Sequence, residues 1–390
     1  MTVPTGIEPP IIELAGVSKV YRSRSSLTKY AQVRAVDDVS LSILPGTTTG
    51  IVGETGSGKS TLGRLLLGLT PPSAGEVRFR GRSVAALDSE GRREYRRSVQ
   101  MVFQSPLGSF NPMLSIGTSI RDALRYAPPS IDPVPHRPDQ HGETARLLDQ
   151  VGLPATFAER YPDEVSGGEL QRASIARALA VGPSVIFLDE PASALDVSVR
   201  GQIFNLLMDL QRDRGLAYVL VTHELPSAEA LADRVVVMYL GRIVEDTPKS
   251  AFFRRAAHPY SVGLIAASEI RAERATRERP LVFGDPPSVT DPPPGCRFHP
   301  RCWLYEQLGR PDRCTESEPQ LELIESGHAS ACFFREQALA REVRDRPDGA
   351  TVTPSLLGGP SLGGPSLGDP SLGGPSLGGL AAAHDQEGAP

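Results

Sequence analysis

The octapeptide GETGSGKS at residues 53–60 restricts what this chain can fold into more than any other segment. It fits the pattern G-x-x-x-x-G-K-[ST] at every fixed position. The preceding TTTGIV has the composition of a buried strand, and the following TLGRLLLGL has that of a helix. Strand, glycine-rich loop and helix in that order predict an α/β fold that binds phosphate groups at the loop.

The residue types of this loop suit that chemistry. Glycines let the backbone turn tightly and bring its N–H groups up to phosphates, and the helix N-terminus adds a field that favours anions. Lys59 supplies a positive charge for the outer phosphates, and the Ser60 hydroxyl is a ligand for Mg²⁺. The residues predicted to line the phosphates of a nucleotide are Gly53, Glu54, Thr55, Gly56, Ser57, Gly58, Lys59, Ser60 and Thr61.

A second informative string is SGGELQR at residues 166–172. Ser166 followed three residues later by Glu169 is a capping box, which predicts a helix through about residue 180. Two glycines in the first turn weaken a helix, so Gly167 and Gly168 indicate that another body approaches the backbone closely. A phosphate group is one such body.

At this string the chain resembles the ATP-binding subunits of ABC transporters, whose signature motif is SGGQ-like. The resemblance implies that Ser166, Gly167 and Gly168 contact the γ-phosphate of an ATP held by the opposite subunit, and that Glu169 completes the signature that faces that subunit. Glu169 and Leu170 stand where the family more often has Gln and Arg. The implied fold is a P-loop ABC-type ATPase, with a RecA-like core, an antiparallel β subdomain and a helical signature subdomain.

The segment VIFLDEP at residues 185–191 has four apolar residues followed by two carboxylates. An apolar run of this length predicts a buried parallel strand, whose C-terminal end faces the ligand crevice. Asp189 at that end is suited to holding Mg²⁺, usually through water. Glu190 is suited to polarising the water that attacks the γ-phosphate.

The family resemblance implies further site residues. Gln104 corresponds to the Q-loop, which reaches Mg²⁺ and the attacking water, and His223 corresponds to the switch histidine near the γ-phosphate. Tyr21 stands where the family places an aromatic that stacks on adenine, although aromatics early in a first strand also serve as ordinary core or surface residues. The D-loop residues, which cross to the partner subunit, are Ser193, Ala194, Leu195 and Asp196.

Longer segments resemble the dipeptide/oligopeptide importer ATPases, and in particular the second ATPase of the pair that such systems usually contain. The resemblance covers about residues 11–335, and related importers carry nickel, glutathione or opines instead. The segments that carry it are RRSVQMVFQSPLGSFNP at 96–112, SALDVSVRGQIFNLLMDLQ at 193–211, ADRVVVMYLGRIVE at 232–245 and HPYSVGLIAA at 258–267.

Composition agrees with a motor that works beside a membrane without entering it. The net charge of −5 indicates no nucleic-acid partner, and no apolar stretch approaches the length of a membrane span. We expect a peripheral protein at the cytoplasmic face of the membrane. The partners implied by the resemblance are two membrane-spanning permease subunits, a second homologous ATPase in a heterodimer and, indirectly, an extracytoplasmic solute-binding protein.

The domain organisation expected from the sequence has four parts. An N-terminal tail covers residues 1–10, the ABC ATPase domain covers 11–256 with its helical subdomain at about 105–180, and a C-terminal extension covers 257–340. The Pro-rich segment at 127–142 predicts a surface loop, and the charged run at 271–279 a solvated helix end or linker. Residues 341–390 contain PSLGG-type repeats, whose Pro and Gly content predicts disorder.

All four cysteines lie in one stretch of the extension, at Cys296, Cys302, Cys314 and Cys332. Clustered cysteines in a cytosolic protein indicate a metal before a disulfide. The segment GCRFHPRC resembles the importer C-terminal motif, which in some members carries a [4Fe–4S] cluster; zinc and unligated or disulfide-bonded cysteines are the alternatives. We expect such a site to be structural, so that Cys302→Ser leaves ATP binding at Lys59 largely intact.

Two other classes of function compete with the transport motor. Soluble ABC ATPases of DNA repair carry long coiled-coil insertions, and those of translation carry two cassettes; this chain has no sustained heptads and one phosphate loop. A metal-binding redox regulator would rest on the cysteines alone and leave the ATPase motifs unexplained. The sequence therefore favours an ABC ATPase that couples ATP hydrolysis to import of dipeptides or oligopeptides.

Overall fold

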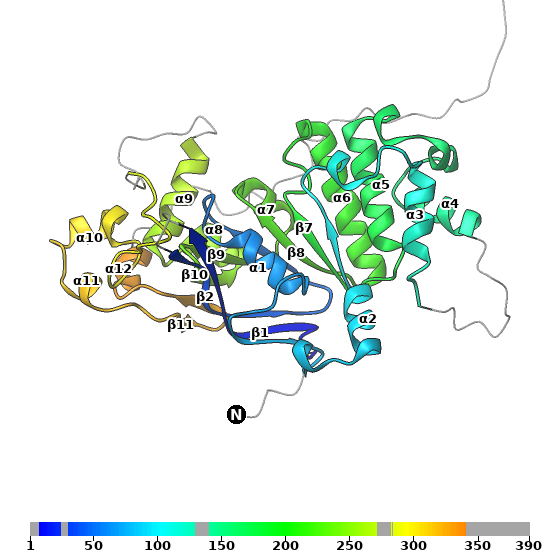
Figure 1. Ribbon diagram of the computed structural model, residues 1–390. Coiled ribbons are helices and arrows are strands. Elements are labelled where there is room, and N and C mark those ends of the chain that lie inside the picture. Colours follow the sequence, from blue (N-terminus) through cyan, green and yellow to red (C-terminus); the bar gives the residue numbers. More distant parts are fainter. Residues whose placement is uncertain (1–7, 25–29, 129–139, 271–281, 283, 341–390) are drawn as a thin grey trace, which may run out of the picture. The chain divides into compact units, whose positions relative to one another are not determined.

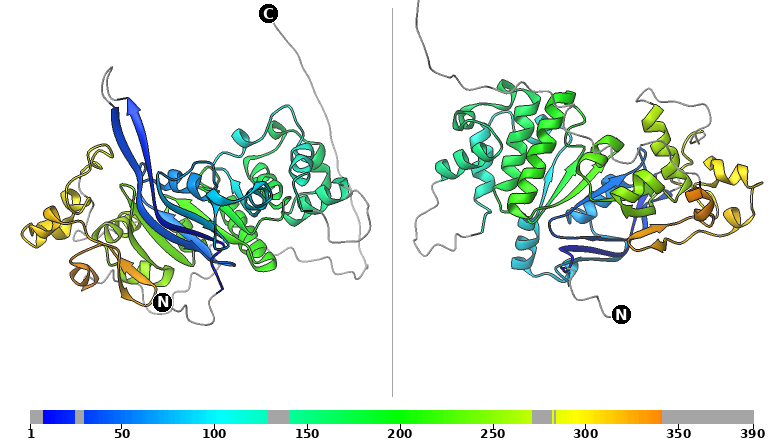
Figure 2. Two further views of the ribbon diagram at one scale, coloured as in Figure 1. Left: turned by 60° about the horizontal axis from the view of Figure 1, so that its bottom comes forward. Right: turned by 180° about the vertical axis from the view of Figure 1, so that it is seen from behind.

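The computed structural model describes residues 8–24, 30–128, 140–270, 282 and 284–340, which belong to one compact unit. Two sheets organise it (Figures 1 and 2). The smaller sheet is antiparallel and contains, in spatial order, β2 (Tyr30–Ile43), β1 (Ile12–Arg24), β4 (Ala74–Phe79) and β5 (Arg82–Ser83). The larger sheet contains, in spatial order, β11 (Glu322–Glu325), β12 (His328–Ser330), β10 (Arg242–Pro248), β9 (Arg234–Tyr239), β3 (Thr48–Val52), β8 (Ala217–Thr222), β7 (Val185–Asp189) and β6 (Val99–Val102).

The centre of the larger sheet is parallel and buried, as the apolar run at 185–188 predicts. Strands β9, β3, β8, β7 and β6 run parallel to their neighbours, and every residue of β3 and β8 is buried. Because helices cover both faces of such a sheet, its strands need no polar side. The phosphate loop after β3 and the two acidic residues after 188 therefore lie at the same, C-terminal edge of the sheet, with β8 between their strands.

The helices divide into those beside the sheets and a separate helical group. The group consists of α3 (Ile116–Leu124), α4 (Gln140–Gln150) and α5 (Gly167–Leu179), which pack around a shared apolar core (Figure 1). The remaining helices before residue 257 are α1 (Lys59–Leu66), α2 (Ser89–Ser98), α6 (Val197–Arg214), α7 (Leu225–Leu231) and α8 (Lys249–Arg255). The short 3-10 turns are Val84–Ala86, Leu107–Ser109, Ala155–Glu159, Pro162–Glu164 and His299–Arg301.

Helix α6 carries an apolar stripe that packs into the core. Its buried residues are Ile203, Phe204, Leu207 and Leu210, whereas Val199 and Leu206 are only partly buried. Val199 approaches Gly168 at the start of the signature helix.

The C-terminal extension continues the larger sheet. It comprises α9 (Pro259–Ile270), α10 (Trp303–Gln307), α11 (Arg313–Glu316), α12 (Arg335–Ala340) and the strands β11 and β12. Strand β12 pairs antiparallel with β10 in the registers Glu245↔Ser330 and Asp246↔Ala329. Backbone hydrogen bonds of one sheet thus cross the domain boundary that the sequence predicts at residue 256/257, and that boundary stays a prediction.

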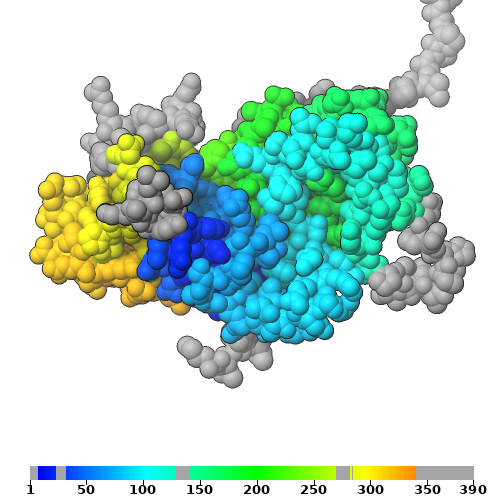
Figure 3. All heavy atoms as spheres, viewed as in Figure 1, coloured from blue at the N-terminus to red at the C-terminus, as the bar shows by residue number. Residues whose placement is uncertain are grey.

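Buried polar contacts join the extension to the ATPase core. Glu245 is fully buried and accepts hydrogen bonds from the backbone N–H groups of Ala257 and His258 and from Nε2 of His328, at 2.6, 3.1 and 2.8 Å. Arg297 forms an ion pair with Asp37 of β2. In Figure 3 the yellow and orange atoms of the extension abut the blue atoms of the N-terminal strands on the face shown. Removing one partner of such a buried pair typically costs about 3 kcal/mol or more, so these contacts hold the extension in place.

Parts of the predictions fall outside the described residues. These are most of the N-terminal tail, most of the Pro-rich segment at 127–142, the charged run at 271–279 and the repeat tail at 341–390. None of the described helices is long and apolar enough to cross a membrane.

Candidate functional site

The phosphate loop has the conformation that its glycines predict. Gly53 and Gly58 have φ angles of 155° and 106°. A Cβ atom at Gly53 would lie 2.3 Å from the carbonyl oxygen of Met238, and one at Gly58 would lie 2.2 Å from that of Ala35. Because both neighbours are strand backbone, no larger side chain fits at either position without moving β9 or β2.

The ammonium of Lys59 lies folded against the loop's own backbone. Its Nζ donates hydrogen bonds to the carbonyl oxygens of Gly53 and Glu54, at 2.7 and 2.8 Å. Burial lowers the pKa of Lys59, whereas the nearby carboxylates of Glu190 and Asp189 act to raise it. A buried cation held mainly by carbonyl dipoles favours an anionic partner, and the phosphates of a nucleotide are suitable partners.

Three residues predicted from distant segments meet beyond the end of β7. Gln104 Nε2 donates a hydrogen bond to one carboxylate oxygen of Glu190 at 2.7 Å, and His223 Nδ1 is hydrogen-bonded to the other oxygen. Glu190 has a φ of 45°, in the left-handed region that non-glycine residues rarely adopt. Such backbone strain is typical of residues whose side chain must point in one functional direction.

Asp189 lies next to this trio and close to the lysine. Burial and the charge of Glu190 raise the pKa of Asp189, and the charge of Lys59 opposes them. An Mg²⁺ ion would remove that repulsion between the two acids by binding the ionised Asp189. Ser60, Gln104 and Asp189 remain the predicted Mg²⁺ residues, and the last two are now seen on neighbouring strand ends.

The signature residues form the capping box that the sequence predicts. Glu169 Oε2 accepts hydrogen bonds from the backbone N–H of Ser166 at 2.8 Å and from its hydroxyl at 2.7 Å, and these bonds lower the pKa of Glu169. The sequence explains Gly168 by the approach of a phosphate, but the structure adds another reason. A Cβ at Gly168 would lie 2.6 Å from Cγ1 of Val199, so packing against α6 already requires glycine there.

The D-loop begins in contact with the trio of Gln104, Glu190 and His223, whereas Tyr21 lies on a strand of the smaller sheet. Ser193 Oγ donates a hydrogen bond to the carbonyl oxygen of Glu190 at 3.2 Å, whereas Ala194 and Asp196 are exposed. Tyr21 lies on β1, where it is paired with Val33, and its ring is 5.4 Å from the ammonium of Lys19. Stacking of Tyr21 on adenine stays a prediction.

Sequence reasoning missed two residues that contact the phosphate loop from the extension. Arg301 pairs with the carboxylate of Glu54, and the Tyr260 hydroxyl accepts a hydrogen bond from the Glu54 backbone N–H. Both lie in recognised strings, HPRC and HPY, but no spacing rule joins these strings to residue 54. Only their positions next to the motifs could have drawn attention to them.

The four cysteines line one small cavity of about 20 Å³ in the extension. Burial raises the pKa of Cys296 to about 12 and that of Cys302 to about 11, and it also raises the pKa values of Cys314 and Cys332. Within the described residues, no three Cys, His, Asp or Glu side chains are arranged as a metal-binding group. The four thiols therefore lie around one cavity, but their described positions do not match the arrangement of a metal-binding group.

Known proteins of one family resemble this chain along most of its length. Residues 36–193 match the ABC transporter model, and residues 244–307 match the model for the oligopeptide/dipeptide transporter C-terminal region. The dipeptide transport ATP-binding protein DppF of Haemophilus influenzae is 40% identical over 325 residues, which are 83% of this chain and 96% of that protein. The chain belongs to the ABC transporter ATP-binding family.

Other comparisons agree with that membership. A probable peptide ABC transporter ATP-binding protein of Sinorhizobium fredii is 45% identical, over 81% of this chain and 87% of that protein. The ATP-binding cassette MJ0796, solved as a dimer in a post-hydrolysis state with ADP and phosphate, matches with a TM-score of 0.54 and 28% identity, over 61% of this chain and 98% of its own. The fold is thus that of a P-loop ABC ATPase, and ATP hydrolysis is its activity.

The trio around Glu190 generates the first prediction. Glu190→Gln should keep ATP binding but slow ATP turnover about 100-fold or more, because an amide polarises the attacking water poorly. Phosphate release measures the turnover, and a fluorescent nucleotide measures the affinity. The control Asp209→Asn, on the exposed face of α6, should change neither quantity. Normal hydrolysis by Glu190→Gln protein would contradict the assignment.

Proposed function

We propose that this chain is the ATP-hydrolysing motor of an importer for dipeptides or oligopeptides. The match of residues 244–307 to the oligopeptide/dipeptide transporter C-terminal region carries the proposal, because that model is named for transporters of these peptides. Relatives named for dipeptide and peptide transport support it over 96% and 87% of their own length. The alternative is the same motor for nickel, glutathione or an opine.

Import needs partners, since the described helices include no membrane span. The partners we propose are two membrane-spanning permease subunits, a second homologous ATPase and, through the permease, an extracytoplasmic solute-binding protein. The chain would then lie at the cytoplasmic face of the membrane as a peripheral subunit. The permease supplies the path for the solute, and this chain supplies the energy.

A surface groove of about 390 Å³ is suited to the permease. Its lining residues include Leu69, Met101, Phe103 and Ala123, from both the sheet side and the helical group, and Leu69 and Phe103 are 70% and 43% exposed. Phe103 directly precedes Gln104, whose amide contacts Glu190. A permease segment seated in this apolar groove would therefore move with the group that polarises the water.

The nucleotide site is proposed to be completed by a second ATPase. Ser166 and Gly167 are exposed, and so are Ala194 and Asp196 of the D-loop, so their polar and backbone groups are available to another chain. In the proposed cycle, ATP with Mg²⁺ bridges the phosphate loop of one subunit and the signature of the other. The dimer closes on ATP, and it reopens after hydrolysis.

Substitution of Phe103 in the groove tests whether this chain docks on a permease and drives import. Phe103→Asp should abolish co-purification with the permease and uptake of a labelled dipeptide, because an exposed apolar ring is replaced by a charge that must be desolvated on docking. Leu323→Asp, on the exposed side of β11, is the matched control and should retain both. Retained assembly in Phe103→Asp would contradict the groove, and uptake of nickel without peptide would decide for the alternative cargo.

Substitution of the signature serine tests the composite site. In a complex in which this chain is paired with its homologue, Ser166→Arg should inactivate the site that contains the partner's phosphate loop more than the site that contains Lys59. Trapping of a photoreactive ATP, followed by separation of the two chains, reports each site. If only the site with Lys59 loses ATP, the two-chain site is wrong.

We further propose that the four cysteines hold a metal group, either a [4Fe–4S] cluster or zinc. Their convergence on one cavity supports this, because four thiolates are a complete donor set for either. The cavity of about 20 Å³ holds roughly one water-sized body, so zinc needs less movement of its walls than a cluster. The group would be structural, since thiolates bound to metal cross-link segments that bury little apolar surface.

Metal analysis of the wild-type protein and of a cysteine variant tests whether the four cysteines bind a metal group. Anaerobically purified protein should absorb near roughly 400 nm if a cluster is present, and it should contain one equivalent of metal if zinc is present. Cys314→Ser should remove either signal and make residues 290–335 more sensitive to protease. Ser330→Ala, in the same extension, is the control and should retain the metal. Wild-type protein with neither metal would contradict both assignments.

A further inference from the structure

The C-terminal extension contacts the phosphate loop directly, at Glu54, which is the second residue of the loop. Arg301 donates from Nη1 and Nη2 to the two carboxylate oxygens of Glu54, at 2.9 and 3.2 Å. Arg301 is 7% exposed and Glu54 is partly buried, so the pair is largely shielded from solvent. A two-pronged contact of this kind fixes both the direction and the distance of the acidic side chain.

A second contact from the extension holds the same residue by its backbone. The N–H of Glu54 donates to the hydroxyl of Tyr260 at 2.9 Å. Tyr260 is fully buried on α9, where its ring is 4.8 Å from that of Tyr239 and 5.3 Å from that of Phe298. Since these rings form one packed cluster, the hydroxyl has little freedom to move away from the loop.

Arg301 is itself held on several sides. Its Nη1 also lies 3.4 Å from the Tyr239 hydroxyl, and its Nε donates to the carbonyl oxygen of Gly284 at 3.1 Å. It ends the short turn His299–Arg301, which directly precedes Cys302. Arg301 is therefore joined by one peptide bond to Cys302, which lines the cysteine cavity.

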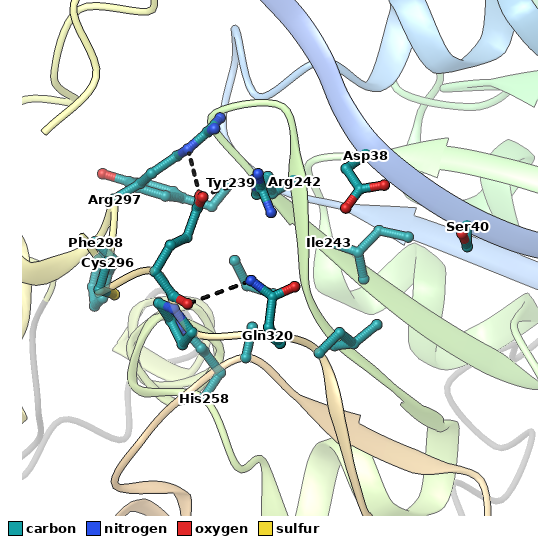
Figure 4. Close-up of a pocket in the computed structure, with 15 residues that line it drawn as sticks. Asp38, Ser40, Tyr239, Arg242, Ile243, His258, Cys296, Arg297, Phe298 and Gln320 are labelled. Carbon is teal, nitrogen blue, oxygen red and sulfur yellow. Dashed lines mark hydrogen bonds and ion pairs between the residues drawn. The ribbon is translucent and has the colours of Figure 1, made fainter. Parts of the chain in front are cut away.

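A neighbouring cavity of about 260 Å³ shows how the same segment is anchored to the core. Arg297, Phe298 and Cys296 of the extension line this cavity together with Tyr239 and Arg242 of the core (Figure 4). Arg297 Nη1 donates to the carbonyl oxygen of Leu240 at 2.6 Å. The segment of the extension that contains Arg297 and Arg301 is thus anchored beside the end of β9. The same end of β9 packs against the phosphate loop at Gly53.

The charge of Glu54 makes these contacts relevant to ATP. A carboxylate in a loop that must accept a polyphosphate repels it, and a paired guanidinium cancels that repulsion. Glu54 also offers its carbonyl oxygen to the Lys59 ammonium at 2.8 Å. A change in the position of Glu54 therefore alters both the charge beside the phosphates and the placement of the lysine.

We propose that Arg301 and Tyr260 are positioning residues for the phosphate loop, and that they couple the cysteine-bearing extension to ATP binding. Arg301 acts through the side chain of Glu54, and Tyr260 acts through its backbone. The coupling is reciprocal, so bound ATP also stabilises the extension. The independence of cysteines and ATP that the sequence led us to expect does not hold under this proposal: Cys302→Ser should weaken ATP binding in the same direction as Arg301→Gln.

A double-mutant cycle on the full-length chain, purified anaerobically, tests the proposal. Arg301→Gln should raise the Kd for the ATP analogue AMP-PNP with Mg²⁺ about 10-fold, within the usual range of coupling between sites. In the Glu54→Gln background the same substitution should change the Kd much less, because no unpaired carboxylate remains. Arg301→Lys should restore part of the affinity. Arg310→Gln, an exposed arginine of the same extension, is the matched control.

Two results would overturn the proposal. One is an unchanged Kd in folded Arg301→Gln protein, and the other is an equal loss of affinity in both backgrounds, which is the behaviour of a residue with a structural role only. If Arg301→Gln fails to fold, hydrogen exchange of the wild-type chain decides instead. AMP-PNP should slow exchange at residues 296–334, and no slowing there would overturn the coupling.

The proposal rests on ATP binding at the phosphate loop and is independent of the cargo. The affinities and exchange rates predicted above therefore hold whether or not the chain takes part in peptide uptake. Wild-type protein that binds no AMP-PNP, with Lys59→Ala indistinguishable from it, would instead refute ATP binding at the loop itself. The two failures are thus separated by one binding measurement on the purified chain.

Discussion

The rest of the site depends on one buried ammonium, that of Lys59. It is held by the carbonyl oxygens of Gly53 and Glu54 and lies near the carboxylates that follow β7. A buried cation is tolerated only where dipoles and anions surround it, so the loop, β3 and β7 must keep this arrangement together. Under the proposed function, ATP would enter a site in which the ammonium is already desolvated, and its phosphates would replace the carbonyl oxygens as partners of Lys59.

The acids near this ammonium explain why residues from three segments converge. Gln104 and His223 both hydrogen-bond to Glu190, and each follows a different strand of the parallel sheet. The carboxylate of Glu190 therefore contacts both the segment after β6 and the segment after β8. Under the proposed function, a permease that shifted Gln104 would break its contact to Glu190, which is proposed to polarise the attacking water.

The extension takes part in the same arrangement. Its strand β12 adds to the larger sheet, Glu245 ties its first residues to the core, and Arg301 reaches the phosphate loop. Four cysteines from separate positions converge in it, although their spacing matches no short metal motif. Burial keeps their pKa values high, so a metal would have to displace protons in order to bind.

The sequence by itself determined the family, the phosphate loop, the signature cap and the acidic strand end, because each is written in neighbouring residues. Glycine φ angles, the hydrogen bond from the Ser166 N–H to the Glu169 carboxylate and the buried strand before Asp189 are local consequences of local residue types. Only the tertiary structure decided that Arg301 contacts Glu54, 247 residues away. Long polar side chains find partners through the packing of the whole sheet, and no periodicity or spacing in the chain encodes that pairing.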